Sequence, residues 1–143
     1  MISYNNPLNI RRTGTGQWVG ETTLRARPGA FCRFSDMKYG FRAAFYLLKK
    51  YYERYHLMSV GQIITRWAPP TENDTTAYID FVVAEMKRRW RDLGPTTELP
   101  HPADDKEVWI ELATAMAKME SGKSRITPSI VLKCEQGYHL MFP

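Results

Sequence analysis

Cysteine and histidine are scarce in this sequence of 143 residues, and neither occurs at the spacing of a metal site. The two cysteines, Cys32 and Cys134, lie far apart, and the three histidines are scattered. We therefore expect no structural metal and no cofactor. The cysteines fit a pair of reduced, buried side chains, with a disulfide as the alternative that the sequence leaves open.

Long apolar runs are also missing, so we expect no segment that spans a membrane. The first ten residues lack the basic start and continuous apolar stretch of a secretory signal, and we expect a protein made in the cytoplasm. The sequence has no GxSxG, no phosphate-binding glycine loop and no HExxH. Single-carboxylate acid/base chemistry is left as the main enzymatic option.

Aromatic and basic side chains, by contrast, are plentiful. Aromatic residues make up 13% of the chain, which indicates a packed globule rather than a disordered segment. The formal net charge of +5 favours an acidic partner, and nucleic acid, an anionic cell-wall polymer and a membrane surface all qualify. The basic residues are spread along the chain instead of forming a tail, which counts against nucleic acid. At this length we expect one domain that covers residues 1–143.

The first 35 residues predict irregular structure with at most short strands. Turn-forming residues gather at 13–16 and 25–29, separated by short apolar clusters. Three asparagines, Asn5, Asn6 and Asn9, also fit simple turn formation.

Apolar periodicity in the rest of the chain predicts a mainly α domain of about five helices. Asp36 can cap a long helix whose buried face runs to Tyr55, and Ser59 and Gln62 have the spacing of a capping box. A third helix is expected to start at Asn73 or Thr75, with Tyr78 and Trp90 in its buried stripe, and to end at Gly94–Pro95. Residues 126–132 fit a helix or a strand, and we favour the helix.

Residues 106–123 predict an amphipathic helix that carries one carboxylate, Glu120, to its end. Asp104 or Asp105 can cap the start, and Gly122 supplies the stop. One helical face holds the apolar residues Val108, Leu112, Ala115, Met116 and Met119. Glu120 therefore leaves the helix at the rim of whatever this face packs on. Partial burial of a carboxyl group favours its protonated form, as general acid catalysis requires, and the alternative is a solvated glutamate beside two lysines.

The segment from Arg66 to Thr75 is the second candidate region. It contains Trp67, two prolines and the pair Glu72–Asn73 between two expected helices, so its stiffened backbone suits the wall of a groove. An aromatic ring there offers a sugar or a base an apolar face. The alternatives are that Trp67 belongs to the core and that Glu72 or Asn73 only begins the next helix, where an acid is favoured.

Several stretches resemble a family of phage and Bacteroides-type structural or virion proteins that is related to lysozyme-like murein hydrolases. The resemblance covers roughly residues 4–80 and rests on Asn5 to Arg11, Trp18 to Gly20, Phe31 to Phe34, Tyr39 to Ala44 and Ile64 to Thr75. The order of these motifs is also similar to the segment that follows the catalytic glutamate in bacterial cell-wall glucosaminidases. The resemblance implies a lysozyme-like helical domain.

This chain departs from that pattern at the catalytic acid. In those enzymes the glutamate lies on a helix before the Asn-Asn segment, and here only four residues precede it. The Glu120-Ser-Gly122 helix end resembles that of lytic transglycosylases, which implies a circularly permuted arrangement. We expect Glu120 to dock beside Asn5, Asn6 and Trp18 as the missing general acid.

The function implied by the resemblance is cleavage of the MurNAc–GlcNAc backbone of peptidoglycan. Glu120 would protonate the glycosidic oxygen, and Glu72 or Glu21 would serve as a second carboxylate if one is used. A lytic transglycosylase is preferred because its substrate supplies the attacking hydroxyl. The residues expected to bind substrate are Asn5, Asn6, Asn9, Arg11, Trp18, Trp67, Asn73 and Tyr78.

Two other classes stay open at this point. One is a catalytically silent lysozyme-like module that serves as a virion or secretion-system part or binds glycan. The other is a basic protein that associates with nucleic acid, which the charge distribution disfavours. For the enzyme or the silent module, we expect association with a virion or delivery to the periplasm by another system.

Overall fold

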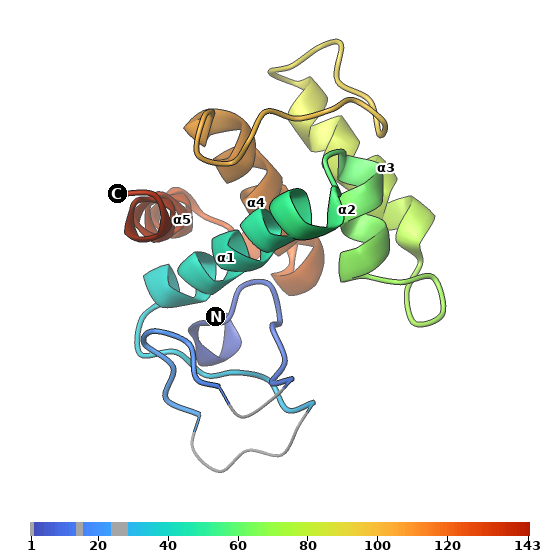
Figure 1. The fold of residues 1–143 in the computed structure, drawn as a ribbon. Coiled ribbons are helices and arrows are strands. Elements are labelled where there is room, and N and C mark those ends of the chain that lie inside the picture. The colour runs from blue at the N-terminus through green and yellow to red at the C-terminus, as the bar shows by residue number, and fades with distance from the viewer. Residues whose placement is uncertain (1, 14–15, 24–28) are drawn as a thin grey trace.

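The computed structural model describes residues 2–13, 16–23 and 29–143, and five α-helices account for most of them (Figure 1). The helices are α1 (Met37–Tyr55), α2 (Val60–Trp67), α3 (Thr75–Lys87), α4 (Lys106–Ser121) and α5 (Pro128–Met141). The mainly α fold predicted from the sequence is confirmed. Two of the expected turns fall on residues 14–15 and 25–28, which lie outside the described residues.

Helix α1 lies at the centre, between α5 on one side and α2 and α3 on the other (Figure 1). Asp36 caps it as expected, because its side chain accepts a hydrogen bond from the backbone N–H of Lys38. The buried face of α1 holds Phe41, Ala44, Phe45 and Leu48. Tyr55 was predicted on this face but is 42% exposed, because the last turn of α1 extends past the core.

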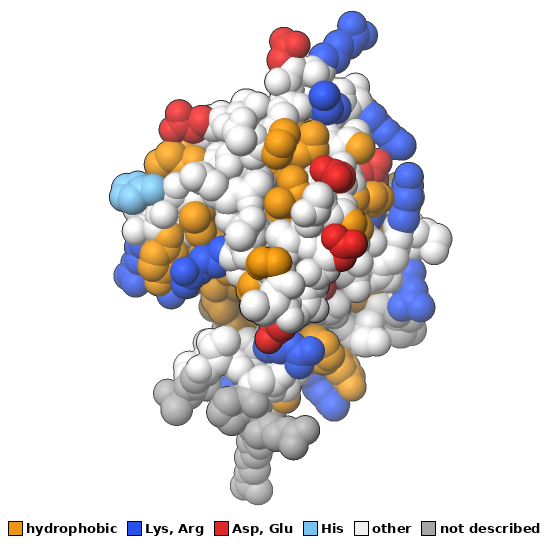
Figure 2. All heavy atoms as spheres, turned by 90° about the vertical axis from the view of Figure 1, so that its right-hand side faces the viewer, with side chains coloured by type: hydrophobic (Ala, Val, Ile, Leu, Met, Phe, Trp, Pro, Cys, Tyr) orange, Lys and Arg blue, Asp and Glu red, His pale blue; other side chains and the backbone are white. Residues whose placement is uncertain are grey.

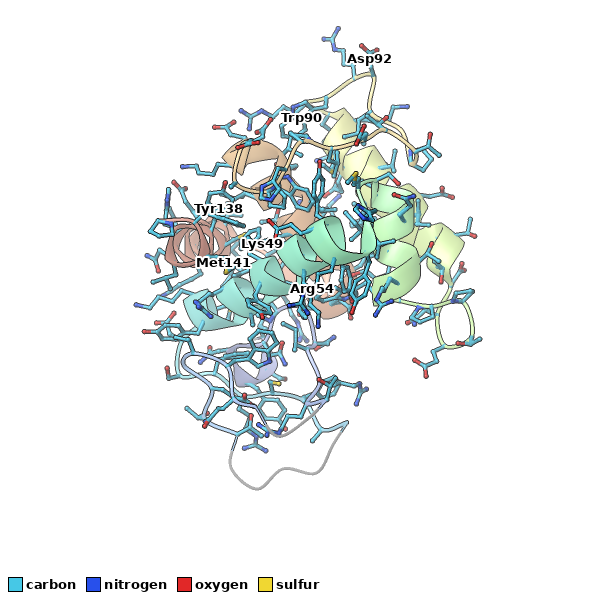
Figure 3. All side chains as sticks on the ribbon, viewed as in Figure 1. Lys49, Arg54, Trp90, Asp92, Tyr138 and Met141 are labelled. Carbon is cyan, nitrogen blue, oxygen red and sulfur yellow. The ribbon has the colours of Figure 1, made fainter. Side chains whose placement is uncertain are left out.

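Helix α5 packs closely along α1. Tyr138 points from α5 toward α1 (Figure 3), and its ring meets that of Phe45 edge-on with centroids 5.4 Å apart. Gly137 makes this approach possible, since a Cβ atom there would lie 2.6 Å from Cβ of Phe41. The ambiguous segment after residue 126 is thus a helix, with Pro128 in its first turn.

The short helix α2 begins with one half of the predicted capping box, because the Gln62 side chain binds the N–H of the residue before the Ser59 cap. Ser59 Oγ accepts from the backbone N–H of Gln62 at 3.3 Å, and Gln62 Oε1 accepts from the N–H of Met58 at 3.0 Å. Helix α3 is capped by Asp74.

The prediction that the third helix runs to Gly94–Pro95 is wrong. Helix α3 ends at Lys87, and Trp90 and Asp92 lie in the connection beyond it (Figure 3). The backbone N–H groups of Arg89 and Trp90 both return to the carbonyl of Met86, which tightens the chain into a turn. Trp90 follows Met86 by four residues, a spacing that suits this turn as well as a helix.

Helix α4 matches its prediction closely. Asp105 caps it, and Gly122 ends it with a φ of 102°, a conformation that glycine adopts without strain. Val108, Leu112, Ala115 and Met116 are buried, whereas Met119 is 37% exposed. The apolar face therefore stops one turn earlier than expected.

The described residues before α1 (2–13, 16–23 and 29–36), which we call the N-terminal segment, pack on α1 as mostly irregular structure. Among them are one 3-10 turn (Ser3–Asn5) and two isolated β-bridges, which pair Arg11 with Phe31 and Glu21 with Phe34. Cys32 of this segment and Cys134 of α5 are both buried free thiols. Among the described residues, no helix is long and apolar enough to cross a membrane.

Candidate functional site

Glu120 lies in the last turn of α4 and receives a hydrogen bond on each carboxylate oxygen. Asn9 Nδ2 donates to Oε1 at 3.2 Å, and the Tyr78 hydroxyl donates to Oε2 at 2.9 Å. The lysines that flank it in the sequence, Lys118 and Lys123, instead approach Glu85, at 2.7 and 4.0 Å. Two neutral donors therefore fix the orientation of the Glu120 carboxylate. Each oxygen has a second lone pair that remains for another partner.

The N-terminal segment and the end of α4 are joined by two further hydrogen bonds. Asn9 Nδ2 also donates to the backbone carbonyl of Glu120 at 3.0 Å, and Ser121 Oγ donates to the carbonyl of Pro7 at 2.7 Å. Asn9 adopts a left-handed φ of 54°, which asparagine tolerates better than most residues. These contacts join parts of the chain more than 100 residues apart.

A cleft of about 690 Å³ opens beside Glu120. It is formed by the N-terminal segment, by α1, and by the end of α2 with the connection to α3. Its lining residues are Leu8, Asn9, Ile10, Arg11, Thr13, Phe31, Leu47, Tyr51, Trp67, Ala68, Glu72, Asn73 and Glu120. The cleft thus combines two carboxylates with several aromatic rings and one guanidinium group. That mixture suits a polar ligand with apolar faces.

Aromatic rings form two parts of the cleft wall. Trp67 meets Tyr51 edge-on, with ring centroids 6.1 Å apart. The Arg11 guanidinium stacks over the ring of Phe31 at 4.1 Å and donates to the carbonyl of Gly29 at 2.7 Å. Flat apolar faces of this kind pack well against sugar rings, whose C–H groups lie on one side.

The connection between α2 and α3 supplies the second carboxylate. Glu72 and Asn73 both donate their backbone N–H to the carbonyl of Pro69, at 3.0 and 3.1 Å. The hydroxyl of Thr75 donates to the carbonyl of Ala68 at 2.5 Å and closes the base of this loop. Glu72 is exposed and faces the cleft from a loop that is held at both ends.

Tyr78 lies behind Glu120 and keeps its proton over the ordinary pH range. Burial raises the pKa of the Tyr78 phenol far above its usual value of 10, and the negative charge of Glu120 and the hydrogen bond to it raise it further. The hydroxyl is therefore a permanent donor to Glu120. The Tyr78 hydroxyl also lies 3.5 Å from the backbone carbonyl of Met116, which is in α4 like Glu120.

Comparison with known proteins shows that the chain is similar to a phage protein. It is 36% identical over 129 residues to Protein P5 of Pseudoalteromonas phage PM2, and the match covers 88% of this chain and 73% of that protein. The chain belongs to the Protein P5 family. No family model matches the chain. The expected kinship with phage proteins is confirmed, whereas kinship with lysozyme-like murein hydrolases stays a prediction.

In this member of the Protein P5 family, six of the residues singled out in the sequence line the cleft together. They are Asn9, Arg11, Trp67, Glu72, Asn73 and Glu120. Tyr78 reaches the site through its hydrogen bond to Glu120 and is 5% exposed.

Asn5 and Asn6 bind backbone groups of the N-terminal segment to which they belong. Asn6 is buried, and its amide nitrogen donates to the carbonyls of Ile10 and Cys32, both at 2.9 Å. Asn5 donates to the carbonyl of Phe34 at 3.0 Å. Both side chains hold the N-terminal segment in shape, and Asn9 is the asparagine that contacts Glu120.

Trp18 and Glu21 line a neighbouring pocket of about 370 Å³ instead of the cleft. The side chain of Glu21 is completely buried and pairs with Arg12 at 2.8 Å. Burial alone would raise the pKa of this carboxyl, but hydrogen bonds from the Trp18 N–H and Arg12 outweigh it and leave the pKa below its usual value. An ionised, fully paired carboxylate of this kind is suited to hold structure together.

The cleft also contains apolar and aromatic residues that were not among the predicted site residues, and two of them, Leu47 and Tyr51, come from α1. Tyr51 lies in the helix whose buried face was expected to run to Tyr55. It is half-buried and is turned toward α2, where its ring meets Trp67. A tyrosine one position away from a buried stripe is the signal that could have identified it.

Proposed function

We propose that this phage protein cleaves the MurNAc–GlcNAc backbone of peptidoglycan, with Glu120 as the general acid. The observation that carries the proposal is the Glu120 carboxylate, held by Asn9 and Tyr78 at the edge of a cleft with aromatic walls. A fixed carboxyl group beside a bound glycan can protonate the glycosidic oxygen as the bond breaks through an oxocarbenium-like state. The six cleft residues singled out above are the proposed site.

The second half of the reaction has two routes. In a lytic transglycosylase, the C6 hydroxyl of MurNAc attacks the anomeric carbon, and the Glu120 carboxylate takes back the hydroxyl proton. In a hydrolase, water attacks, and Glu72 is the carboxylate available within the cleft. We prefer the first route because it requires no second acid.

We propose further that residues 1–143 form one lysozyme-like domain whose elements are circularly permuted. The contact between Asn9 and Glu120 supports this, because it brings the end of α4 to the asparagine segment, and a similar segment follows the acid in the glucosaminidases that the sequence resembles. The net charge of +5 supports an anionic polymer as the partner. On the face seen in Figure 2, Lys and Arg side chains are separated by other residues, so this face carries no continuous basic patch of the kind that suits nucleic acid.

Kinship with a phage protein supports association with a virion, from which such an enzyme would reach the wall of the host. The silent structural or glycan-binding module is the alternative within the same family. Such a module would bind glycan in the same cleft without cleaving it.

Clearing of purified peptidoglycan tests the proposal. We expect the wild-type protein to lower the turbidity of a peptidoglycan suspension and Glu120→Gln to lose at least about a hundredfold in rate, a typical contribution of a general acid. Glu107→Gln is the matched control, because Glu107 is on the same helix and pairs with Arg89 at the surface. Wall binding without clearing by the wild type would identify the silent module, and salt-dependent retention of DNA without wall binding would identify a nucleic-acid protein.

A further inference from the structure

A third hollow, of about 960 Å³, adjoins the cleft at Tyr51, which lines both. We call it the Arg66 groove, after the residue in the last turn of α2 that lines it. Much of its surface is apolar and comes from Leu57, Pro69, Ile79 and Pro95. A ligand that fills the cleft can therefore extend a branch over Tyr51 into this groove.

Arg66 is the charged residue of the Arg66 groove. Its guanidinium lies over the ring of Tyr55 at 4.2 Å and over that of Tyr51 at 5.6 Å, so two aromatic rings hold it in place. The side chain is exposed, and among residues 2–13, 16–23 and 29–143 no carboxylate forms an ion pair with it. Burial keeps the pKa of Tyr51 above its usual value despite the nearby Arg66, so the phenol does not neutralise the guanidinium. The Arg66 guanidinium is thus held in one orientation by two rings and has no ion-pair partner among the described residues.

We propose that the Arg66 groove binds the peptide stem of peptidoglycan and that Arg66 pairs with one of its carboxylates. This inference rests on the proposed function, in which the glycan occupies the cleft. Peptide stems branch sideways from the MurNAc units, so a glycan beside Glu120 would present a stem to an adjoining groove. A planar guanidinium matches a carboxylate with two parallel hydrogen bonds. The apolar lining suits the aliphatic parts of amino-acid side chains better than a strongly hydrated phosphate.

Binding of the inactive Glu120→Gln variant to two kinds of sacculi tests this inference. One kind carries peptide stems, and the other has been stripped of them by an amidase, so the glycan is the same in both. We expect about fivefold tighter binding to the peptide-bearing sacculi, which corresponds to about 1 kcal/mol and is the upper range for an exposed ion pair. Adding Arg66→Gln should abolish this preference, and added salt should reduce it.

Arg91→Gln, added to Glu120→Gln, is the matched control, since it removes the same charge from an exposed arginine beyond α3. This double variant should still bind the peptide-bearing sacculi more tightly than the stripped ones. Equal binding of Glu120→Gln to both kinds of sacculi, or a preference that survives Arg66→Gln, would overturn the peptide-stem inference while the proposed function stands. If Arg66→Gln weakens binding to the stripped sacculi as much as binding to the peptide-bearing sacculi, the groove binds a phosphate of the wall, and the peptide-stem inference is overturned. No binding to either kind would overturn the proposed function itself.

Discussion

The side-chain amide of Asn9 contacts both the backbone carbonyl and the carboxylate of Glu120, at 3.0 and 3.2 Å. The two residues are 111 positions apart in the chain. One amide group therefore fixes the last turn of α4 against the N-terminal segment and orients the proposed acid at the same time. The structural and the catalytic contributions of Asn9 can be separated by choosing its replacement.

We predict that Asn9→Gly and Asn9→Ala lose activity to a similar extent but differ in stability. Both remove the donor to Glu120, which should lower the rate of peptidoglycan clearing about tenfold, as expected for a lost hydrogen bond to a charged group. Asn9 has a φ of 54°, which glycine adopts freely, whereas alanine should cost a further ~1 kcal/mol. Clearing rates and urea unfolding of both variants measure the two effects. Full activity of Asn9→Gly would show that Asn9 does not position the acid.

Tyr78→Phe should reduce activity while leaving the fold intact. The ring stays packed, but the hydrogen bond to Glu120 Oε2 is lost, at a cost of about 1 kcal/mol in unfolding free energy. With one donor fewer, Glu120 should be less well oriented, so we expect kcat to fall and the pH profile of kcat to shift. A variant that is destabilised but has an unchanged kcat and pH profile would restrict Tyr78 to a structural role.

The raised pKa of Tyr78 also predicts a loss of stability at alkaline pH. An unfolded tyrosine ionises near pH 10, whereas the buried phenol holds its proton to a higher pH. The stabilisation is therefore complete below pH 10 and declines as the pH rises above it. Cys32 acts in the same direction, since burial raises its pKa to about 12. The urea midpoint should fall between pH 9 and 11, and it should fall less steeply in Tyr78→Phe.

Glu21→Gln should destabilise the protein without removing its chemistry. The variant removes the ion pair between the Glu21 side chain, which is completely buried, and the Arg12 side chain, which is 12% exposed, and breaking a buried pair of this kind costs roughly 3 kcal/mol. The lowered pKa of Glu21 means that its stabilisation is present above about pH 4.5 and is lost as the pH falls below that value. Glu21→Gln should therefore unfold more easily at neutral pH and show a shallower acid transition.

Activity distinguishes this role of Glu21 from that of a second carboxylate. Measured at a temperature where Glu21→Gln is still folded, peptidoglycan clearing should match that of the wild type. Glu53→Gln, which alters exposed contacts with Lys49 and His101, is a suitable control and should change stability little. A folded Glu21→Gln protein without activity would place Glu21 in the reaction.

Glu72→Gln separates the two routes of bond cleavage. A lytic transglycosylase needs no second carboxylate, so the variant should stay active and release anhydro-muropeptides. These products are lighter than hydrolysis products by one water, which mass spectrometry of the soluble fragments detects. A reaction that requires Glu72 and yields reducing ends would identify a hydrolase instead.

Local signals in the sequence predicted the helices well, because capping is decided by neighbouring residues. Asp36, Ser59 and Asp105 all cap as expected, and Gly122 ends α4. The end of α3 was missed because Trp90 continues the apolar spacing from Met86, although the backbone turns there.

The candidate site was predictable in part. Glu120 and Glu72 are at a helix end and in a stiff loop, where their sequence position already points them out of the core, and Trp67 ends α2 half-buried against the core. The sequence could not distinguish the role of Asn9 from those of Asn5 and Asn6. Asn6 donates to the carbonyl of Cys32, 26 residues away, and only the path of the folded chain brings these two groups together. Tyr51 was missed for a related reason, since its partner Trp67 belongs to another helix.

The separation of Asn9 and Glu120 along the chain has a consequence for synthesis. A ribosome that adds about 5–20 residues per second completes Glu120 roughly 5–20 s after Asn9. Until then the nascent chain carries the asparagine and the aromatic wall of the cleft but no acid. Under the proposed function, a chain released before α4 is made is inert toward the wall, and activity begins only after Glu120 has been added.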